Sequence, residues 1–274
     1  MLKSWKKILL TLSILALSYG CANAEVLEFA QVGDVHYTYG NQDLDKYLYF
    51  LNLSLRKKNV DFAVFLGDNV DKSTEENVIG LMRCLYPWRI PYYLVLGNND
   101  AHKLNGLEKE VYLDIVTTFN HNQKDRANYY YFKPNSDFIC VVLDDTPDFA
   151  PSNHGEVSDE QLVWLDNLLT KYSKKMFIIF QHSPLNPPRE EFKLSMLNSD
   201  KYREVIKKHS NIVLMSSGHY HQDSIQKDDS GIWHISAPAF SEAPHSYQMI
   251  KITYDEKNIK SSKDITVDVT RVKV

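Results

Sequence analysis

The stretch VLEFAQVGDVH, residues 26–36, joins an apolar run to a glycine and then to Asp34 and His36, two side chains that can bind a metal ion. Similar short runs, rich in Val, Ile, Phe and Tyr, recur along the chain at residues 26–32, 62–66, 92–96, 138–143, 176–180 and 212–215. Continuous runs of this length are typical of strands that are buried on both faces of a sheet. We therefore expect these runs to form the core strands of the fold.

Segments with helical spacing lie between the runs. Residues 44–55 place leucines and a tyrosine on one face and are followed by three cations, and residues 158–161 fit a capping box that opens another helix. Further helices are expected around residues 75–86, 108–119 and 200–208. Strands and helices that alternate in this order predict an α/β fold with a mainly parallel sheet and helices outside it.

The C-terminal part of the chain has a different pattern. From Gly231 onward, short strands are expected at residues 232–235, 248–253 and 265–269, separated by turn-rich stretches. We expect these strands to be antiparallel and to close a second sheet. No internal repeat or linker interrupts the sequence, so residues 25–274 are interpreted as one domain.

The first 24 residues have the features of a cleaved secretory signal peptide. Three lysines precede an apolar run at residues 8–17, and the small-residue triplet Ala22-Asn23-Ala24 follows it. The run is about half as long as the stretch of roughly 20 residues that spans a bilayer, so we expect no stable membrane span. The protein is therefore predicted to be exported, to the periplasm or the medium if it is bacterial.

The net charge of the mature chain narrows the classes of molecule that the protein could bind. Removal of residues 1–24 takes away three lysines and no acid, so the formal charge of −4 becomes −7. A net acidic protein is a poor candidate for binding nucleic acid or an anionic membrane.

The mature chain keeps Cys84 and Cys140, which an oxidising compartment could join. Because Cys140 lies in an apolar run, a buried free thiol is the favoured interpretation.

Potential metal ligands follow five of the expected strands. The loops at the carboxyl ends of parallel strands converge on one crevice, so residues far apart in sequence can meet there. A mixed set of aspartate, asparagine and histidine side chains is typical of sites for Mn²⁺, Fe²⁺ or Zn²⁺. It is less typical of a calcium site, which has oxygen ligands only, or of a thiolate site. The seven candidate ligands are Asp34, His36, Asp68, Asn98, His182, His219 and His221.

Read in order, these motifs resemble those of the calcineurin-like metallophosphoesterase superfamily over about residues 26–240. The matching motifs are Asp34-x-His36, Gly67-Asp68, Gly97-Asn98-Asn99-Asp100, His182 and Gly218-His219-x-His221. Residues 155–165 resemble the cyclic-nucleotide phosphodiesterase and purple-acid-phosphatase-like branch, although Asp71 stands where purple acid phosphatases carry an iron-binding tyrosine. The resemblance implies a four-layer α/β/β/α sandwich with mixed sheets.

The same resemblance implies an enzyme with two divalent metal ions, Mn, Fe or Zn, and a small phosphorylated substrate. Its implied reaction is the hydrolysis of a phosphate monoester or diester by attack of a metal-bridging hydroxide. It assigns Asp34, His36, Asp68 and His221 to one ion and Asp68, Asn98, His182 and His219 to the other. Asp68 would then bridge the two ions.

Asn99 departs from the family pattern, which has a histidine at this position. An asparagine can donate a hydrogen bond but cannot transfer a proton at neutral pH. The resemblance implies that the following acid, here Asp100, orients the side chain at position 99, which makes Asn99 and Asp100 catalytic candidates. His102 is the third candidate because it lies nearby and could supply the missing proton donor, as could His121 or His154. The sequence therefore leaves two possibilities open: an active phosphoesterase, or a catalytically weakened or inactive metal- or ligand-binding member of the same fold.

A serine hydrolase is disfavoured because no Gly-x-Ser-x-Gly motif accompanies Ser216 or Ser217. The sequence does not specify the natural substrate or the preference for monoester or diester. It also leaves open the identity of the metal and the oligomeric state.

Overall fold

The computed structural model describes residues 24–123, 126–259 and 261–274. The predicted signal peptide lies outside the described residues except for Ala24, which begins the first strand. Within the described part of the chain, no helix has both the length and the apolar character that crossing a membrane requires.

The first sheet has five strands in the order β11-β10-β1-β2-β3. Strands β1, β2 and β3 run parallel to one another, whereas β10 is antiparallel to both β1 and β11. The bounds are β1 (Ala24–Val32), β2 (Phe62–Phe65), β3 (Tyr92–Leu94), β10 (Ser246–Asp255) and β11 (Thr266–Lys273).

The second sheet has six strands in the order β4-β5-β6-β7-β9-β8. Four of them, β5, β6, β7 and β9, are parallel, and antiparallel strands β4 and β8 form the two edges. The bounds are β4 (Tyr130–Phe132), β5 (Phe138–Val142), β6 (Met176–Phe180), β7 (Ile212–Ser217), β8 (Ser224–Lys227) and β9 (Trp233–Ser236).

The expected position of the C-terminal strands was wrong. Strands β10 and β11 extend the first sheet instead of closing the second, and β9 joins the second sheet parallel to β7. The reason is that β10 is apolar on both faces: Ile250 and Ile252 face the core between the sheets, while Tyr247 and Met249 face the helices. A strand buried on both faces is suited to a central position, and β10 lies between β1 and β11.

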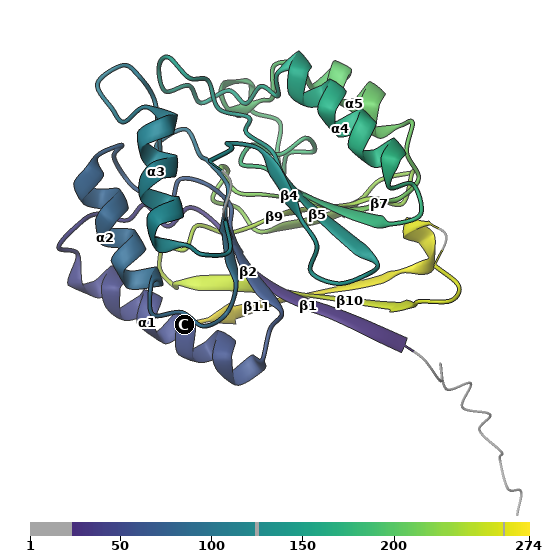
Figure 1. Cartoon of the computed structure of the whole chain (residues 1–274), viewed down its shortest axis with the longest axis horizontal. Helices are drawn as coiled ribbons and strands as arrows, with labels where there is room; N and C mark the ends of the chain where they lie inside the picture. The colour runs from purple at the N-terminus through teal and green to yellow at the C-terminus, as the bar shows by residue number, and fades with distance from the viewer. Residues whose placement is uncertain (1–23, 124–125, 260) are drawn as a thin grey trace, which may run out of the picture.

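Helices cover the outer face of each sheet, as Figure 1 shows. One group packs on the first sheet and comprises α1 (Gln42–Lys58), α2 (Glu75–Leu85) and α3 (Lys109–Phe119). The other group packs on the second sheet and comprises α4 (Asp159–Lys171) and α5 (Ser199–Ile206). Two short 3-10 helices, η1 (Phe192–Leu194) and η2 (Ser262–Asp264), complete the described elements. The predicted four-layer sandwich with mixed sheets is confirmed.

Three apolar cores fill the spaces between the four layers. Strand β2 shows why: Ala63 and Phe65 pack toward the helices, while Phe62 and Val64 pack against the second sheet. In the core between the sheets, the Phe62 ring stacks on Phe29 with 4.8 Å between ring centroids. Cys140 is buried in the same core as a free thiol, which agrees with the sequence, and Cys84 is also free.

Candidate metal centre

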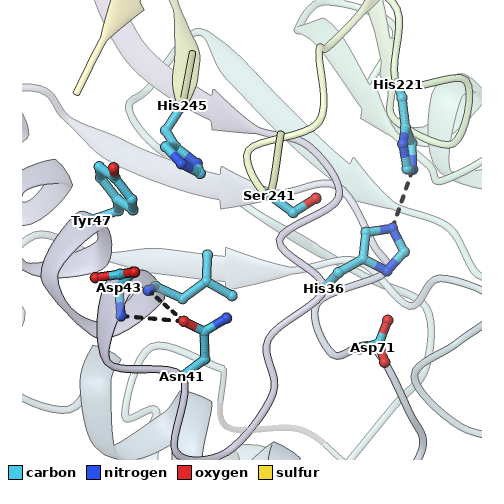
Figure 2. A pocket seen from close by; sticks show the side chains of 9 residues that line it. His36, Asn41, Asp43, Tyr47, Asp71, His221, Ser241 and His245 are labelled. Atoms are coloured by element: carbon cyan, nitrogen blue, oxygen red, sulfur yellow. Dashed lines mark hydrogen bonds between the residues drawn. The ribbon is translucent and has the colours of Figure 1, made fainter. Parts of the chain in front are cut away.

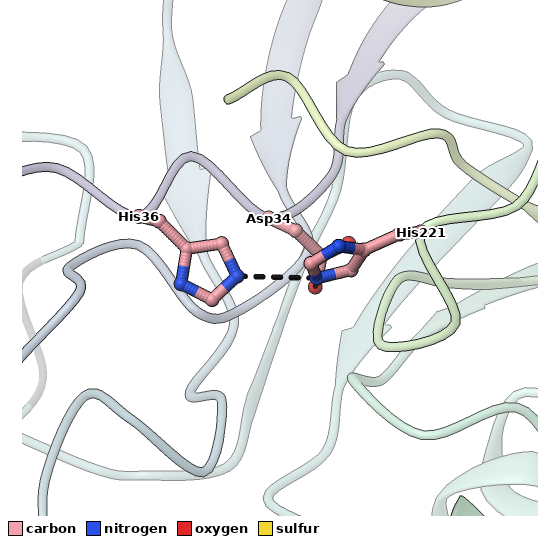
Figure 3. A group of neighbouring side chains, drawn as sticks. All are labelled: Asp34, His36 and His221. Carbon is pink, nitrogen blue, oxygen red and sulfur yellow. Dashed lines mark hydrogen bonds and ion pairs between the residues drawn. The ribbon is translucent and has the colours of Figure 1, made fainter. Parts of the chain in front are cut away.

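The strand exits converge at one edge of the sandwich. His36 donates its backbone N–H to the Asp68 carbonyl at 2.9 Å, which ties the loop after β1 to the loop after β2. One group of three potential ligands is Asp34, His36 and His221, whose ligand atoms all lie within 4.8 Å of one another (Figure 3). His36 Nε2 and His221 Nε2 are 3.1 Å apart.

A second group lies deeper and shares residues with the first. Asp34, Asp68 and His182 also place their ligand atoms within 4.8 Å of one another. The His182 Nε2 atom is 3.5 Å from Asp68 Oδ1, 3.1 Å from Asn98 Oδ1 and 3.1 Å from His219 Nδ1. The structure therefore brings all seven predicted ligands together, and Asp68 lies between the groups, 3.8 Å from His36 Nε2.

The backbone at this edge is strained. Seven described non-glycine residues have a left-handed φ, and five of them are candidate ligands. Side chains other than glycine avoid this conformation at a cost of about 1–2 kcal/mol each. Such strain is held only where the surrounding structure fixes it, and it concentrates at functional sites. The strained ligands are Asp34, His36, Asp68, His219 and His221.

Two glycines make the close packing of these loops possible. A Cβ atom on Gly97 would lie 1.9 Å from the Asp68 backbone nitrogen, which no side chain tolerates. Gly67 has a φ of +87°, and a Cβ atom there would lie 2.5 Å from His182 Nδ1. Both glycines are therefore needed for close approach, and at Gly67 the left-handed φ is a second reason for glycine.

In three of the histidines, the ring nitrogen that points away from the centre donates a hydrogen bond to a carbonyl or carboxylate oxygen. His182 Nδ1 lies 2.8 Å from the Leu66 carbonyl oxygen, and His219 Nε2 lies 2.8 Å from the Asn153 carbonyl oxygen. His221 Nδ1 lies 2.7 Å from Glu242 Oε1. When such a ring is neutral, its other nitrogen carries a lone pair, and in all three histidines that nitrogen faces the centre.

This arrangement fits cations. With neutral rings, His182 Nε2 faces Asn98 Oδ1 and His219 Nδ1 at 3.1 Å, and all three atoms are acceptors with no proton between them. Acceptors brought this close in a buried site require a positive charge between them. Imidazole, carboxylate and amide oxygen together are a donor set for divalent ions such as Mn²⁺, Fe²⁺ or Zn²⁺.

The pKa values of the buried groups show the same need for positive charge. Burial raises the pKa of Asp34 to about 6. Burial opposes protonation of His182, but the nearby carboxylates of Asp68, Asp34 and Asp145 outweigh it and raise the pKa of His182 to about 9. Burial, followed by the adjacent His182, lowers the pKa of His219 to about 3. In metal-free protein these carboxylates therefore favour the protonated form of His182.

These shifts predict how metal binding depends on pH. The pKa of His182 rises from 6.5 to about 9 on folding, so between these values the metal-free native state holds more protons than the unfolded state. At lower pH the lowered pKa of His219 offsets the raised pKa of Asp34. The stability of the metal-free protein should therefore fall as pH rises from about 6.5 to about 9. Bound metal ions replace the protons, so the increase in melting temperature on adding Mn²⁺ should be larger at about pH 8.5 than at about pH 6. An increase that is equal or smaller at the higher pH would contradict this assignment.

Asn99 and Asp100 lie at the centre, where their side chains form hydrogen bonds with neighbouring protein groups. Asn99 donates its backbone N–H and its side-chain amide to the two oxygens of Asp68, at 2.8 and 2.9 Å. The buried carboxylate of Asp100 accepts hydrogen bonds from the backbone N–H groups of Gly97 and Val70. Asp100 therefore ties the β2 and β3 exits together, and it does not orient the side chain at position 99.

The three histidines considered as proton donors lie in different surroundings. His102 packs against Gly106, and its buried Nδ1 atom has no partner among the described residues. His154 is adjacent to Asn153, whose carbonyl holds His219, and its own Nδ1 atom is 3.3 Å from the Ser195 carbonyl oxygen. His121 is exposed in the loop after α3. A role for any of them in proton transfer stays a prediction.

Sequence reasoning missed the residues that hold the ligands from behind. Asp145 is fully buried and accepts the backbone N–H of His182 at 3.1 Å, which fixes the β6 exit. Asn153 contributes only a backbone carbonyl, so no side-chain pattern could have revealed it. Glu242 lies outside every motif, in the connection between β9 and β10. Its role could be predicted only if the position of this connection at the centre were already known.

Glu242 is expected to strengthen metal binding through His221. Glu242→Gln retains an oxygen that can accept from His221 Nδ1 but removes the negative charge, which makes the ring a weaker ligand. We expect one of two Mn²⁺ ions to bind about 10-fold more weakly, measured by isothermal titration calorimetry. The exposed Glu256 serves as the matched control, and Glu256→Gln should change neither ion. Unchanged binding in Glu242→Gln would exclude this role.

Comparison with known proteins agrees with this centre. The family model of calcineurin-like phosphoesterases matches residues 27–223. The chain is 24% identical over 213 residues to a probable glycerophosphodiester phosphodiesterase of Arcobacter nitrofigilis, covering 71% of each protein. It is 25% identical over 248 residues to a manganese-dependent ADP-ribose/CDP-alcohol diphosphatase of Danio rerio, covering 86% of this chain and 71% of the relative.

A solved structure shows the same fold. The crystal structure of a dimetal phosphatase from Danio rerio superimposes with a TM-score of 0.66 at 18% sequence identity, covering 88% of this chain and 98% of that one. The family match itself extends over well more than half of the sequence. The chain therefore belongs to the calcineurin-like phosphoesterase family.

Proposed function

We propose that this protein is an exported, dimetal-dependent hydrolase of a small phosphate diester or monoester. One ion would be held by Asp34, His36, Asp68 and His221, and the other by Asp68, Asn98, His182 and His219. The observation that carries the proposal is the buried cluster in which His182 Nε2 lies 3.1 Å from both Asn98 Oδ1 and His219 Nδ1, beside the carboxylate of Asp68. Relatives named as phosphodiesterases and diphosphatases support the reaction class.

The residues of the chain would orient the substrate and shape the site. Two divalent ions at such a centre supply a water-derived nucleophile and neutralise the phosphate oxygens. Asn99 holds both oxygens of Asp68, so it keeps the carboxylate shared by the two ion positions in one orientation. The buried positions of Asp34 and His182, both with no exposed surface, keep bulk water away from the inner side of the centre.

The test is hydrolysis of an aryl diester and an aryl monoester by metal-free protein reconstituted with Mn²⁺, Fe²⁺ or Zn²⁺. We expect turnover that depends on the added metal and is lost with a chelator. Protein that binds two ions but hydrolyses neither ester would instead support the second candidate, an inactive metal- or ligand-binding protein. That candidate is motivated by Asn99, which replaces the usual histidine and donates to Asp68 at 2.9 Å.

Export is proposed from the lysines and the apolar run that precede Ala24. The expected mature N-terminus is Glu25, to be determined by mass spectrometry of protein from cell fractions. Full-length protein with Met1 intact in the cytoplasmic fraction would refute export without affecting the proposed reaction.

A further inference from the structure

A cavity of about 590 Å³ opens directly beside the metal centre. Figure 2 shows His36 and His221 on one side of it and Tyr47 and His245 on the other. Its lining also includes Asp43 at the start of α1 and Asp71 in the loop after β2. We call this cavity the ester-group pocket, because it is large enough for the part of a substrate that lies beyond the phosphate.

The centre is open toward this pocket. The side chains of His36 and His221 are 17% and 33% exposed, whereas that of His182 is fully buried. On the inner side, the Asn153 carbonyl covers His219. A phosphate group that reaches the ions past His36 and His221 would therefore place one of its ester groups in the pocket.

The pocket offers negative charge and hydrogen-bond acceptors. Asp71 makes no side-chain hydrogen bond or ion pair with any residue in the described ranges. Among the described residues, Asp43 pairs with Lys46 at 3.2 Å, and because both side chains are exposed this contact contributes little in water. His245 Nδ1 lies 2.8 Å from the Phe240 carbonyl oxygen and donates to it, so its Nε2 is left as an acceptor.

Apart from the proposed metal ions, the described lining of the pocket offers no free positive group that could favour an anion. None of the described residues that line the pocket is a lysine or an arginine. Helix α1 begins here, but Asn41 Oδ1 accepts from the backbone N–H groups of Asp43 and Leu44, so this helix end is capped by the protein itself. The far wall is aromatic, with Tyr47 stacked on His245 at 3.7 Å between ring centroids.

We propose that the ester-group pocket selects substrates whose ester group carries a protonated amine, as in a phosphodiester of an amino alcohol. An ammonium group is attracted to the carboxylates of Asp43 and Asp71, which lie on different sides of the pocket, and to the face of an aromatic ring such as Tyr47. A carboxylate in the same position would be repelled. The inference rests on the proposed phosphodiesterase function and specifies its substrate class.

The test uses three methyl phosphodiesters that differ at one end only. Their second alcohols are 2-aminoethanol, 1,2-ethanediol and 3-hydroxypropanoate, and the common methyl group is too small to occupy the pocket. Hydrolysis by the Mn²⁺-loaded protein is followed by phosphorus NMR, which also identifies the ester that leaves. We expect kcat/KM to be highest for the amine and at least about 10-fold lower for the carboxylate, as expected for unit charges a few ångströms apart near a surface.

Variants separate the effect of pocket charge on kcat/KM from the effect of leaving-group acidity. The acidity belongs to the substrate, so it is the same for every variant. Asp43→Asn and Asp71→Asn should each lower the amine-to-carboxylate ratio of kcat/KM by about 3-fold, and the double variant by about 10-fold. Asp268→Asn, on the edge strand β11 outside the pocket lining, is the matched control and should keep the wild-type ratio. The diester of 1,2-ethanediol gives the uncharged reference within each variant.

The outcomes distinguish this inference from the proposed function. Metal-dependent hydrolysis with equal kcat/KM for all three diesters, or with a ratio that the double variant leaves unchanged, overturns the pocket assignment alone. A wild-type protein that binds Mn²⁺ and hydrolyses none of the diesters or aryl esters overturns the proposed function and the pocket assignment with it.

Discussion

Asp68→Asn is expected to reduce metal-dependent phosphodiester hydrolysis by at least about 10³-fold. Asp68 is 4% exposed and lies between the two groups of ligands, 3.8 Å from His36 and 3.5 Å from His182. Residues that only support a ligand already contribute 10- to 100-fold, so loss of the shared carboxylate should cost more. Asparagine has nearly the same shape, which makes loss of charge the main change.

A buried acid outside the centre provides the control for Asp68→Asn. Asp144 is 2% exposed and accepts from Lys109 Nζ at 2.6 Å. Asp144→Asn should lower the free energy of unfolding but leave the number of bound Mn²⁺ ions and the reaction rate per folded molecule close to the wild type. An Asp68→Asn protein that still holds two ions at wild-type activity would exclude the bridging role.

Asp100→Ala is expected to destabilise the metal-free protein by about 3 kcal/mol or more. The fully buried carboxylate accepts from Gly97 N, Val70 N and Asn69 Nδ2, and each donor left without a partner costs about 1–3 kcal/mol. Burial and the neighbouring Asp68 raise the pKa of Asp100 to about 7, and the backbone N–H groups of Gly97 and Val70 act in the opposite direction. Metal affinity should also fall, by about 10- to 100-fold, because the β2 and β3 exits lose their tie.

Urea unfolding and Mn²⁺ titration measure the two effects of Asp100→Ala separately. Asp100→Asn keeps one acceptor oxygen and should be less destabilised than Asp100→Ala. If Asp100 served only to orient the side chain at position 99, both variants would unfold like the wild type and bind Mn²⁺ normally, and only the reaction rate would change.

Much of the fold was predictable because local pattern and burial agree. The apolar runs became strands buried on both faces, and the glycine and ligand motifs fell at strand exits, where parallel strands bring distant residues together. The position of β10 was not predictable in this way. Its apolar residues fit either sheet, and the choice depends on long-range pairing with β1 from Ala24 to Gln31.

The candidate site was predictable in its ligands but not in their supports. Asp34, His36 and Asp68 belong to short motifs, so their residue types and spacing indicate their chemistry. Glu242 and the Asn153 carbonyl come from loops that reach the centre only after the two sheets have packed. The motif indicates Asp100 from the sequence, but its partners Val70 and Asn69 become visible only in the structure.

The most direct test of the central claim is anomalous diffraction from crystals of the Mn²⁺-loaded protein. We expect two peaks roughly 3.5–4 Å apart, with Asp68 in contact with both. One peak should lie next to Asp34, His36 and His221, and the other next to Asn98, His182 and His219. No peak at these residues, or a single peak that Asp68 does not contact, would contradict a dimetal centre in this protein.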